Sequence, residues 1–432
     1  MLSDKARFVF KLLRFFVPQG FRVLGQRIAA QHHSLTYKPT PNRKNVVIIG
    51  GSFAGIHLAR RLAQSLPTGY KVVLIEKNSH FNFAFQFPRV SVMPEREHTV
   101  FIPYDGIVQG APEGIFTQIR DTVTSIEDNY VVLTSGEKID YSYLALATGS
   151  SQPAPVKASS AERRDACMEL RGMQQRIEKS QRIALIGAGA VGIEISTDIK
   201  DLYPNKEVTL IHSRSKVMNQ FGKKLSDYTE QRLKDLGIRT LLNERPQVPA
   251  DLSSEEPKTL TFSDGHSETF DLVIRCTGQI PNSAILRSYL PSSISKENSR
   301  VLIHPTLQVR TDDNRHPNIF AIGDVAEHGG PRMGRAGQMQ AEVAAENIVM
   351  MIRGRQASKP YVPNTEVEGF VHLTLGHKHY VIFVPDQGGN DVLITANNGG
   401  EENEMARWWK TYGADWEQAK PVTDKEAALA WV

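Results

Sequence analysis

Cysteine is nearly absent from this sequence of 432 residues, in which only Cys167 and Cys276 occur. Two widely separated cysteines cannot build a disulfide framework, and their spacing does not fit the CxxC motif of redox or metal sites. The composition therefore fits a reducing or redox-neutral compartment. Cys276 lies in an apolar segment, where burial raises the pKa of a thiol, so we expect it to be inert. We expect no metal site.

Acidic residues are scarce at the N-terminus. Residues 1–44 hold Asp4 as their only acid and nine basic residues: Lys5, Arg7, Lys11, Arg14, Arg22, Arg27, Lys38, Arg43 and Lys44. Because the whole chain has a net charge of +4, the rest of it is slightly acidic. A basic leader on an acidic body argues against a nucleic-acid-binding surface on the folded part.

The leader also lacks an apolar run of the roughly 20 residues that span a bilayer. Its pattern predicts a basic amphipathic helix up to Pro18, with these residues on opposite faces: Arg7, Lys11 and Arg14 against Phe8, Leu12, Phe15 and Phe16. Three interpretations remain open, namely a helix on an anionic membrane surface, a mitochondrial presequence and an ordinary docking helix. Leu2 replaces the glycine that N-myristoylation requires, which excludes that anchor.

The rest of the chain is organised around a glycine-rich turn. Residues 46–49 are apolar and β-branched, as in a strand buried on both faces of a parallel sheet. Gly50, Ser52 and Gly55 then occupy the glycine positions of GxGxxG, a turn that seats a pyrophosphate on the N-terminus of a helix. Ser52 departs from the motif, although its hydroxyl can donate to a phosphate. The next strand ends in Glu76, where an acid binds the ribose hydroxyls of a dinucleotide.

A second turn of this kind, Gly187, Gly189 and Gly192, follows GxGxxG without exception. Two such turns in one chain indicate two dinucleotides. The strand after the second turn ends in His212, followed by Ser213 and Arg214, where an acid would favour the 2′-hydroxyl of NADH. Arginine and serine suit a 2′-phosphate, so we expect NADPH to be preferred and NADH tolerated.

Three further apolar strands end in tight turns that can approach a cofactor closely. They are followed by Thr148 and Gly149, by Gly278, and by Gly323 and Asp324. A carboxylate at a strand end, such as that of Asp324, can hold a polyol hydroxyl.

Taken together, VVIIGGSFAG with Glu76, LALATGS, IALIGAGAVGIE, VTLIHS, CTG and IFAIGD resemble the FAD-dependent pyridine nucleotide oxidoreductases. Within them the chain is most similar to the AMID-like group, which includes the ferroptosis suppressor protein and other relatives of apoptosis-inducing factor, and which is similar to type II NADH dehydrogenases. The resemblance implies an α/β fold of two Rossmann-like domains of the glutathione-reductase type, the second inserted in the first, and a small C-terminal α+β segment. The boundaries we expect are 1–44 for the leader and linker, 45–155 with 283–365 for the FAD-binding domain, 156–282 for the NAD(P)H-binding domain, and 366–432 for the C-terminal segment.

The resemblance also implies roles for individual residues. FAD would be held by Gly50, Gly51, Ser52, Phe53, Ala54, Gly55, Glu76, Arg89, Val123 and Asp324, and NAD(P)H by the second glycine turn. Glu194 matches a family glutamate near nicotinamide and flavin, and Lys410 matches a family lysine close to the flavin. The departures are Ser52 and a C-terminal tail that extends past the usual end of the family.

The expected activity is hydride transfer from NAD(P)H to FAD, with electrons then passed to an acceptor. The missing cysteine pair argues against a thiol relay, and the basic leader favours a quinone reached at a membrane surface. The enzyme would then be membrane-associated inside the cell, mitochondrial or facing the cytosol, and homo-oligomerisation is left open. Two alternatives are a flavin-containing redox or death-signalling protein with little turnover and a small-molecule oxidoreductase of specialised metabolism.

Overall fold

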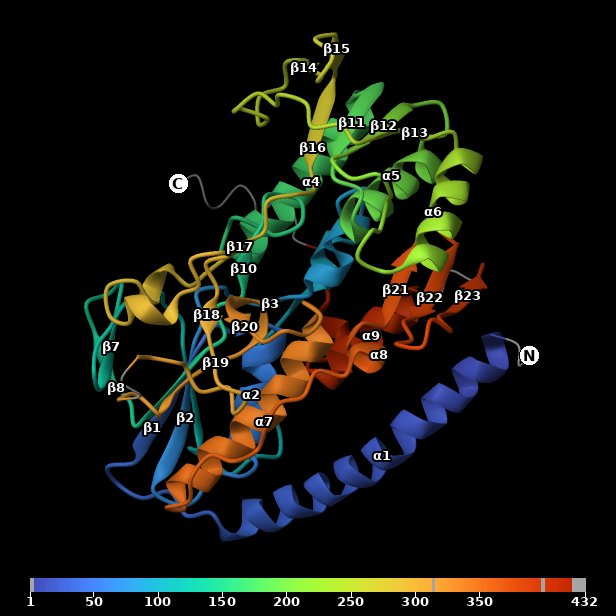
Figure 1. Ribbon diagram of the computed structural model, residues 1–432. Helices are drawn as coiled ribbons and strands as arrows, with labels where there is room; N and C mark the ends of the chain where they lie inside the picture. The colour runs from blue at the N-terminus through green and yellow to red at the C-terminus, as the bar shows by residue number, and fades with distance from the viewer. Residues whose placement is uncertain (1–3, 313–314, 398–400, 422–432) are drawn as a thin grey trace.

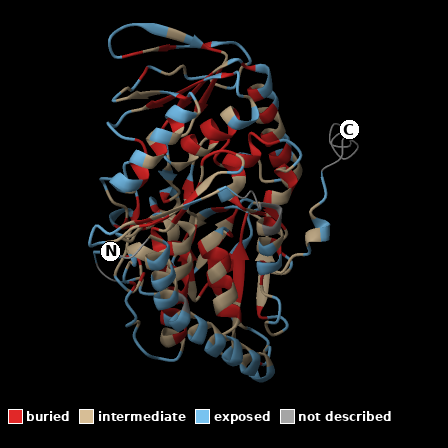
Figure 2. Ribbon diagram, turned by 90° about the vertical axis from the view of Figure 1, so that its right-hand side faces the viewer, coloured by how far each residue is buried: buried red, intermediate tan, exposed pale blue. Residues whose placement is uncertain are grey.

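The computed structural model describes residues 4–312, 315–397 and 401–421. They form an α/β structure with two parallel sheets, smaller antiparallel sheets and one long N-terminal helix, α1, along the side of the body (Figure 1). The buried residues gather in the interior of the sheets and the helices that cover them (Figure 2). The expected end of the C-terminal segment, residues 422–432, lies outside the described residues.

The first parallel sheet has the strand order β19-β9-β1-β2-β5. Its strands are β1 (Lys44–Ile49), β2 (Tyr70–Ile75), β5 (Phe116–Ile119), β9 (Tyr143–Leu146) and β19 (Ile319–Ala321). The central strand β1 pairs with β2 on one side and β9 on the other, and residues 46–49 are buried, as their apolar run predicts. Helices α2 (Phe53–Ala63) and α7 (Gly334–Ile352) pack closely together, since a Cβ at Gly337 would lie only 3.0 Å from Ala54.

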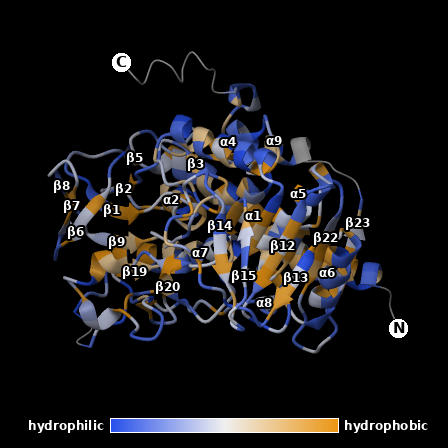
Figure 3. Cartoon of the chain, turned by 90° about the horizontal axis from the view of Figure 1, so that it is seen from above, coloured by the Kyte–Doolittle hydropathy of each residue, from blue (hydrophilic) through white to orange (hydrophobic). Residues whose placement is uncertain are grey.

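The second parallel sheet has the strand order β13-β12-β11-β16. Its strands and the helices around it are β11 (Arg182–Ile186), β12 (Glu207–His212), β13 (Arg239–Leu242), β16 (Leu272–Arg275), α4 (Arg163–Lys179), α5 (Ala190–Leu202) and α6 (Lys223–Asp235). Figure 3 shows hydrophobic residues along the strands of both sheets. Each sheet therefore has its own apolar core.

Two short strands join the sheets where the chain leaves the first and returns to it. β10 (Ser150–Ser151) follows β9, and β17 (Ile280–Pro281) follows β16; the two pair antiparallel. The chain then rejoins the first sheet through β19. This is the order that insertion of the second domain in the first requires, while the domain boundaries themselves stay a prediction.

The remaining elements are short. They are β3 (Phe81–Asn82), α3 (Phe87–Val90), β4 (Phe101–Ile102), β6 (Val123–Ile126), β7 (Tyr130–Leu133), β8 (Lys138–Asp140), β14 (Lys258–Thr261), β15 (Ser267–Phe270), β18 (Val301–Leu302), β20 (Ala326–Glu327), α8 (Thr365–Glu368), β21 (Val371–Thr374), β22 (Tyr380–Val384), β23 (Val392–Ala396) and α9 (Glu401–Thr411). The last three strands form an antiparallel sheet, which α9 follows.

Helix α1 (Asp4–Thr36) corrects the prediction that the leader helix ends at Pro18. A proline inside a helix costs about 3 kcal/mol, but contacts with the body hold α1 on both sides of it. Before Pro18, the Lys11 ammonium lies 2.5 Å from Asp386. After it, Arg22 and Gln26 donate to the buried carboxylate of Glu342 on α7, at 3.0 and 2.8 Å.

The two faces of α1 also differ from the predicted ones. Arg7 and Lys11 are only partly exposed, and they share the body-facing side with the partly buried Phe8, Leu12 and Phe15. Another set of apolar residues points away from the body, each more than half exposed: Val9, Phe10, Leu13, Val17, Phe21, Leu24, Ile28 and Leu35. We call this set the outer stripe. No helix in the described part of the chain is long and apolar enough to cross a membrane.

Candidate functional site

The first glycine turn brings helix α2 very close to strand β1. Gly50 has φ +101°, and a Cβ at Gly55 would lie 1.8 Å from the Gly50 carbonyl oxygen, so neither position accepts a side chain. Ser52 is the N-cap residue of α2, but its side chain makes no capping hydrogen bond, and the first turn holds no acid. The N–H groups at this helix end, and the Ser52 hydroxyl, are therefore available to an anion.

Glu76 is placed directly beside this turn. It follows β2, is buried, and accepts hydrogen bonds from the backbone N–H of Gly51 and, at 2.8 Å, of Asn78. The Tyr104 hydroxyl donates to the Gly51 carbonyl at 2.7 Å. Sequence reasoning missed Tyr104, because its segment has no regular pattern.

The second glycine turn repeats the geometry of the first. Gly187 has φ +118°, and a Cβ at Gly192 would lie 1.9 Å from the Gly187 carbonyl oxygen. Gly189 is the N-cap of α5, again without a side-chain cap or an acid in the first turn. A Cβ at Gly189 would meet no described heavy atom within 4 Å, so the space beside it is open.

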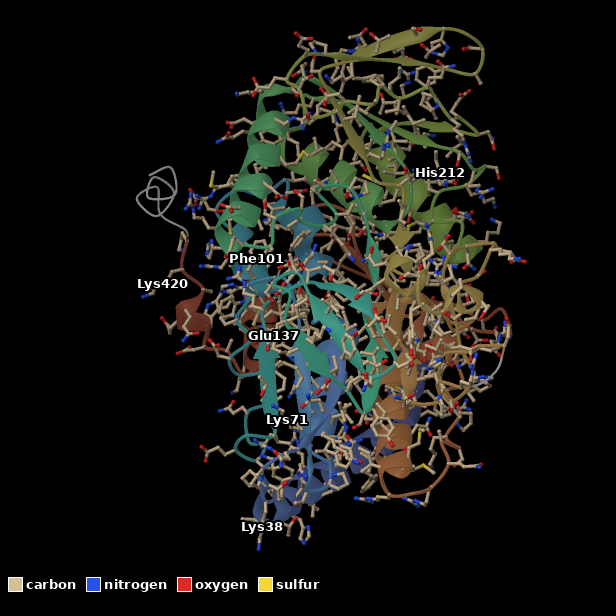
Figure 4. The ribbon with its side chains drawn as sticks, turned by 90° about the vertical axis from the view of Figure 1, so that its left-hand side faces the viewer. Lys38, Lys71, Phe101, Glu137, His212 and Lys420 are labelled. Atoms are coloured by element: carbon tan, nitrogen blue, oxygen red, sulfur yellow. The ribbon has the colours of Figure 1, made fainter. Side chains whose placement is uncertain are left out.

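His212, which Figure 4 labels, ends β12, and its ring contacts Ala188 of this second turn. Its Nδ1 accepts a hydrogen bond of 3.3 Å from the N–H of Ala188, which assigns the ring proton to Nε2. Burial lowers the pKa of His212, and the nearby Arg214 guanidinium lowers it further. Ser213, Arg214 and Lys216 are exposed just beyond the strand. A neutral imidazole beside exposed cations is compatible with a phosphate at this position.

The ends of three strands meet near Asp324. Gln279 donates from Nε2 to the Asp324 carboxylate and to the Ser150 hydroxyl, both at 2.9 Å, and Ser150 lies 3.2 Å from the same carboxylate. Thr148 is tied to Asn282 by reciprocal hydrogen bonds of 2.9 and 2.8 Å. These contacts fix the turns around Thr148 and Gly149, Gly278, and Gly323 relative to one another.

Lys157 is another residue that sequence reasoning missed. Its ammonium donates to the Ser150 carbonyl, and burial lowers its pKa, while the carboxylates of Asp324 and Glu76 oppose that change. Both acids that were expected to bind FAD therefore act electrostatically on Lys157. A lysine in an irregular segment carries no signal in the sequence, and only the folded chain brings it to these carboxylates.

Glu194 is on α5, and its Oε1 accepts hydrogen bonds from the backbone N–H and the hydroxyl of Thr374, at 3.2 and 3.0 Å. Burial raises the pKa of Glu194 to about 7; the Asp198 carboxylate adds to the rise, and the Thr374 bonds oppose it. A carboxyl group with this pKa exchanges a proton easily near neutral pH.

Arg89 occupies a buried junction between α3, α5 and the C-terminal segment. Its Nε and Nη2 donate to the two carboxylate oxygens of Asp198 at 3.1 and 3.0 Å, and further donations reach the carbonyls of Gly376 and His377. Burial raises the pKa of Asp198 to about 6, against the attraction of Arg89. Arg89 therefore anchors three parts of the fold, and its contact with FAD stays a prediction.

Lys410 and Val123 lie in different surroundings. Lys410 is exposed on α9, whereas its neighbour Trp409 is buried and donates from Nε1 to the Thr99 carbonyl at 2.7 Å. Val123 starts β6 and packs in the apolar core of the first sheet. Their roles toward the flavin stay predictions, as do those of Phe53 and Ala54 in the first turn of α2.

The two cysteines are weakly acidic thiols. Burial raises the thiol pKa of Cys167 and of Cys276 to about 12. A raised thiol pKa lowers the thiolate fraction, which supports the inert role expected for Cys276; that role stays a prediction. Cys276 directly follows β16 and does not lie inside it.

Comparison with protein families gives a match over most of the chain. The family described as pyridine nucleotide-disulphide oxidoreductase matches residues 44–347. Helix α1 lies outside this range.

Curated relatives include Fe-regulated protein 8 of Mycosarcoma maydis, 33% identical over 345 residues, and ferroptosis suppressor protein 1 of Homo sapiens, 32% identical over 332 residues. Each alignment covers 73% of this chain and 83% of the relative. Among solved structures, the sulfide:quinone oxidoreductase of Aquifex aeolicus is similar, with a TM-score of 0.67 at 19% identity, covering 90% of this chain and 95% of that one. The relatives confirm the resemblance drawn from the motifs.

Proposed function

Because the chain belongs to the pyridine nucleotide-disulphide oxidoreductase family, we propose that it is an FAD-dependent NAD(P)H:quinone oxidoreductase that works at a membrane surface. FAD and NAD(P)H are its cofactors. The two open helix N-termini of α2 and α5 fit two pyrophosphates, since each offers unpaired N–H groups and follows a glycine turn that brings the helix close to its strand.

The proposed overall reaction consumes NAD(P)H, one proton and a quinone, and releases NAD(P)+ and the two-electron-reduced quinol. Bound flavin supplies the chemistry that accepts a hydride and releases electrons to the quinone. The chain supplies position: Glu76 and Asp324 lie at strand ends where they can bind hydroxyls of FAD, and the hydrogen bonds of Gln279 fix Asp324. Glu194, with its pKa of about 7, is the group we propose to hold and deliver the proton.

The preferred coenzyme in this proposal is NADPH. The end of β12 carries no acid that would repel a 2′-phosphate, and Arg214 and Ser213 are exposed there. The substitution Arg214→Ala should raise the KM for NADPH and leave the KM for NADH unchanged. Equal changes for the two coenzymes would contradict this assignment.

The outer stripe of α1 is the observation that carries the membrane part of the proposal. Its apolar side chains point away from the body, while ion pairs on the other side hold the helix to the body. Lys5, Arg14 and Arg27 are exposed beside the stripe. An exposed apolar face flanked by cations is the pattern of a helix that lies in an anionic membrane interface.

The test is a visible spectrum of the purified protein without oxygen. NADPH should bleach the flavin bands, and a ubiquinone analogue should restore them. Gly189→Val is a matched control, because its side chain fills only the open space beside the second turn; this variant should keep its flavin but resist bleaching. Wild-type flavin that neither NADPH nor NADH bleaches would refute the proposal and favour the signalling interpretation.

A further inference from the structure

A cavity of about 520 Å³ lies between α1 and the body, a volume typical of small-molecule sites. One wall is the body-facing side of α1, and the other comes from residues 362–367, Phe370, Val384 and Arg335. Helix α1 and most of the opposite wall lie outside residues 44–347, which match the family.

The cavity is lined by apolar and polar side chains together. Phe8, Leu12 and Phe15 line it from α1, and Phe370 and Val384 line it from the body. All five are partly or fully buried.

Lys11 crosses from α1 to the body at this cavity, with its ammonium 3.0 Å from Glu366 and 2.5 Å from Asp386. These ion pairs hold the helix in place over the space.

Arg335, in the first turn of α7, is the cation in the body wall. Its Nη1 donates to the carbonyls of Val367 and Phe370 at 2.8 and 3.3 Å, and its guanidinium lies 4.6 Å from the centre of the Phe370 ring. Among the described residues no carboxylate pairs with Arg335, and its Nε and Nη2 make no hydrogen bond. A half-buried arginine with spare donors can bind a ligand oxygen.

The body wall of the cavity is connected to the first glycine turn through Gly334. Gly334 precedes Arg335, and a Cβ at Gly334 would lie 2.8 Å from Phe85 and 3.1 Å from Phe53, which begins α2. The Phe85 ring is 4.5 Å from that of Phe53 and is half exposed. Phe53 and Phe85 therefore form an aromatic surface against the residue that precedes Arg335.

We propose that this cavity binds the apolar tail of the quinone, with Arg335 donating to an oxygen of the quinone ring near Phe85. The inference rests on the proposed function. The apolar part of the lining suits a prenyl or alkyl chain. The helix that forms one wall carries the outer stripe on its other side. A tail that leaves a membrane beneath α1 would thus enter the cavity without crossing water.

Two neighbouring leucines give a matched test. Leu12 lines the cavity, whereas Leu13 belongs to the outer stripe. In detergent micelles, Leu12→Trp should raise the KM for decylubiquinone roughly tenfold, because a larger side chain would leave about two methylene groups of the tail in water. The KM for a tail-less quinone should stay unchanged. Leu13→Ser should change neither KM. Val362→Trp, on the exposed rim of the opposite wall, should act like Leu12→Trp.

Direct binding separates this inference from the proposed function. Equilibrium dialysis of decylubiquinone against the oxidised holoprotein should show weaker binding for Leu12→Trp and for Arg335→Met than for wild type. Unchanged binding and unchanged KM in both tryptophan variants, or an equal rise in KM for both quinones, would overturn the inference. If wild type reduces neither quinone, the proposed function fails, and dialysis alone still decides whether the cavity takes the tail.

Discussion

Removing the outer stripe should detach the protein from membranes. Consider the triple substitution of Leu13, Phe21 and Leu24 by serine; these side chains are 58%, 74% and 55% exposed. Full burial of such a side chain is worth about 1.5–3 kcal/mol. If the exposed fractions of the three side chains enter a bilayer, they together contribute about 4 kcal/mol to the free energy of membrane binding. Partitioning onto vesicles should therefore fall by roughly a thousandfold, since about 1.4 kcal/mol corresponds to tenfold.

The assay is flotation of the holoprotein with vesicles that contain anionic lipid. The matched control is a double variant in which serine replaces Met168 and Leu202, two exposed apolar residues outside α1. It should float as well as wild type. Reduction of a tail-less quinone in solution should be the same in all three proteins, because no substituted residue touches the proposed sites. If the triple variant floats as well as wild type, the outer stripe does not bind membranes and the reasoning is wrong.

Three further outcomes are expected. Glu194→Gln should remove the fall in quinone turnover that wild type shows as pH rises above about 7, where Glu194 loses its proton; a steady-state pH profile checks this. His57 and two arginines lower the pKa of the Glu342 carboxyl to about 2, despite its burial. The ionised carboxylate therefore contributes about 3 kcal/mol to the free energy of unfolding. This contribution is present above pH 4.5 and is lost as the pH falls toward 2. In acid unfolding experiments, the stability of the Glu342→Gln variant should not show this decrease between pH 4.5 and about 2. Arg89→Met should lower the free energy of unfolding in urea by about 3–5 kcal/mol, because it leaves the buried Asp198 carboxylate unpaired. Adding Asp198→Leu should restore part of this stability.

Much of the candidate site follows from local sequence. At Gly55 and Gly192 a side chain would strike the carbonyl oxygen of Gly50 or of Gly187, so the two helix N-termini could be located from the glycine spacing alone. Strand ends are equally local, which is why the turns at Thr148 and Asp324 were found. Gln279 and Lys157 were not, because they reach Asp324 only after distant segments fold together.

The sequence by itself determined the two dinucleotide turns, the parallel strands before them and the basic, helical character of the leader, since each depends on neighbours within a few residues. Only the tertiary structure decided which face of α1 meets the body. Apolar residues occur on both faces of this helix, Leu12 on one and Leu13 on the other, and spacing cannot choose between them. Ion pairs from Lys11 and Arg22 to distant acids make that choice, and with it they create both the outer stripe and the cavity.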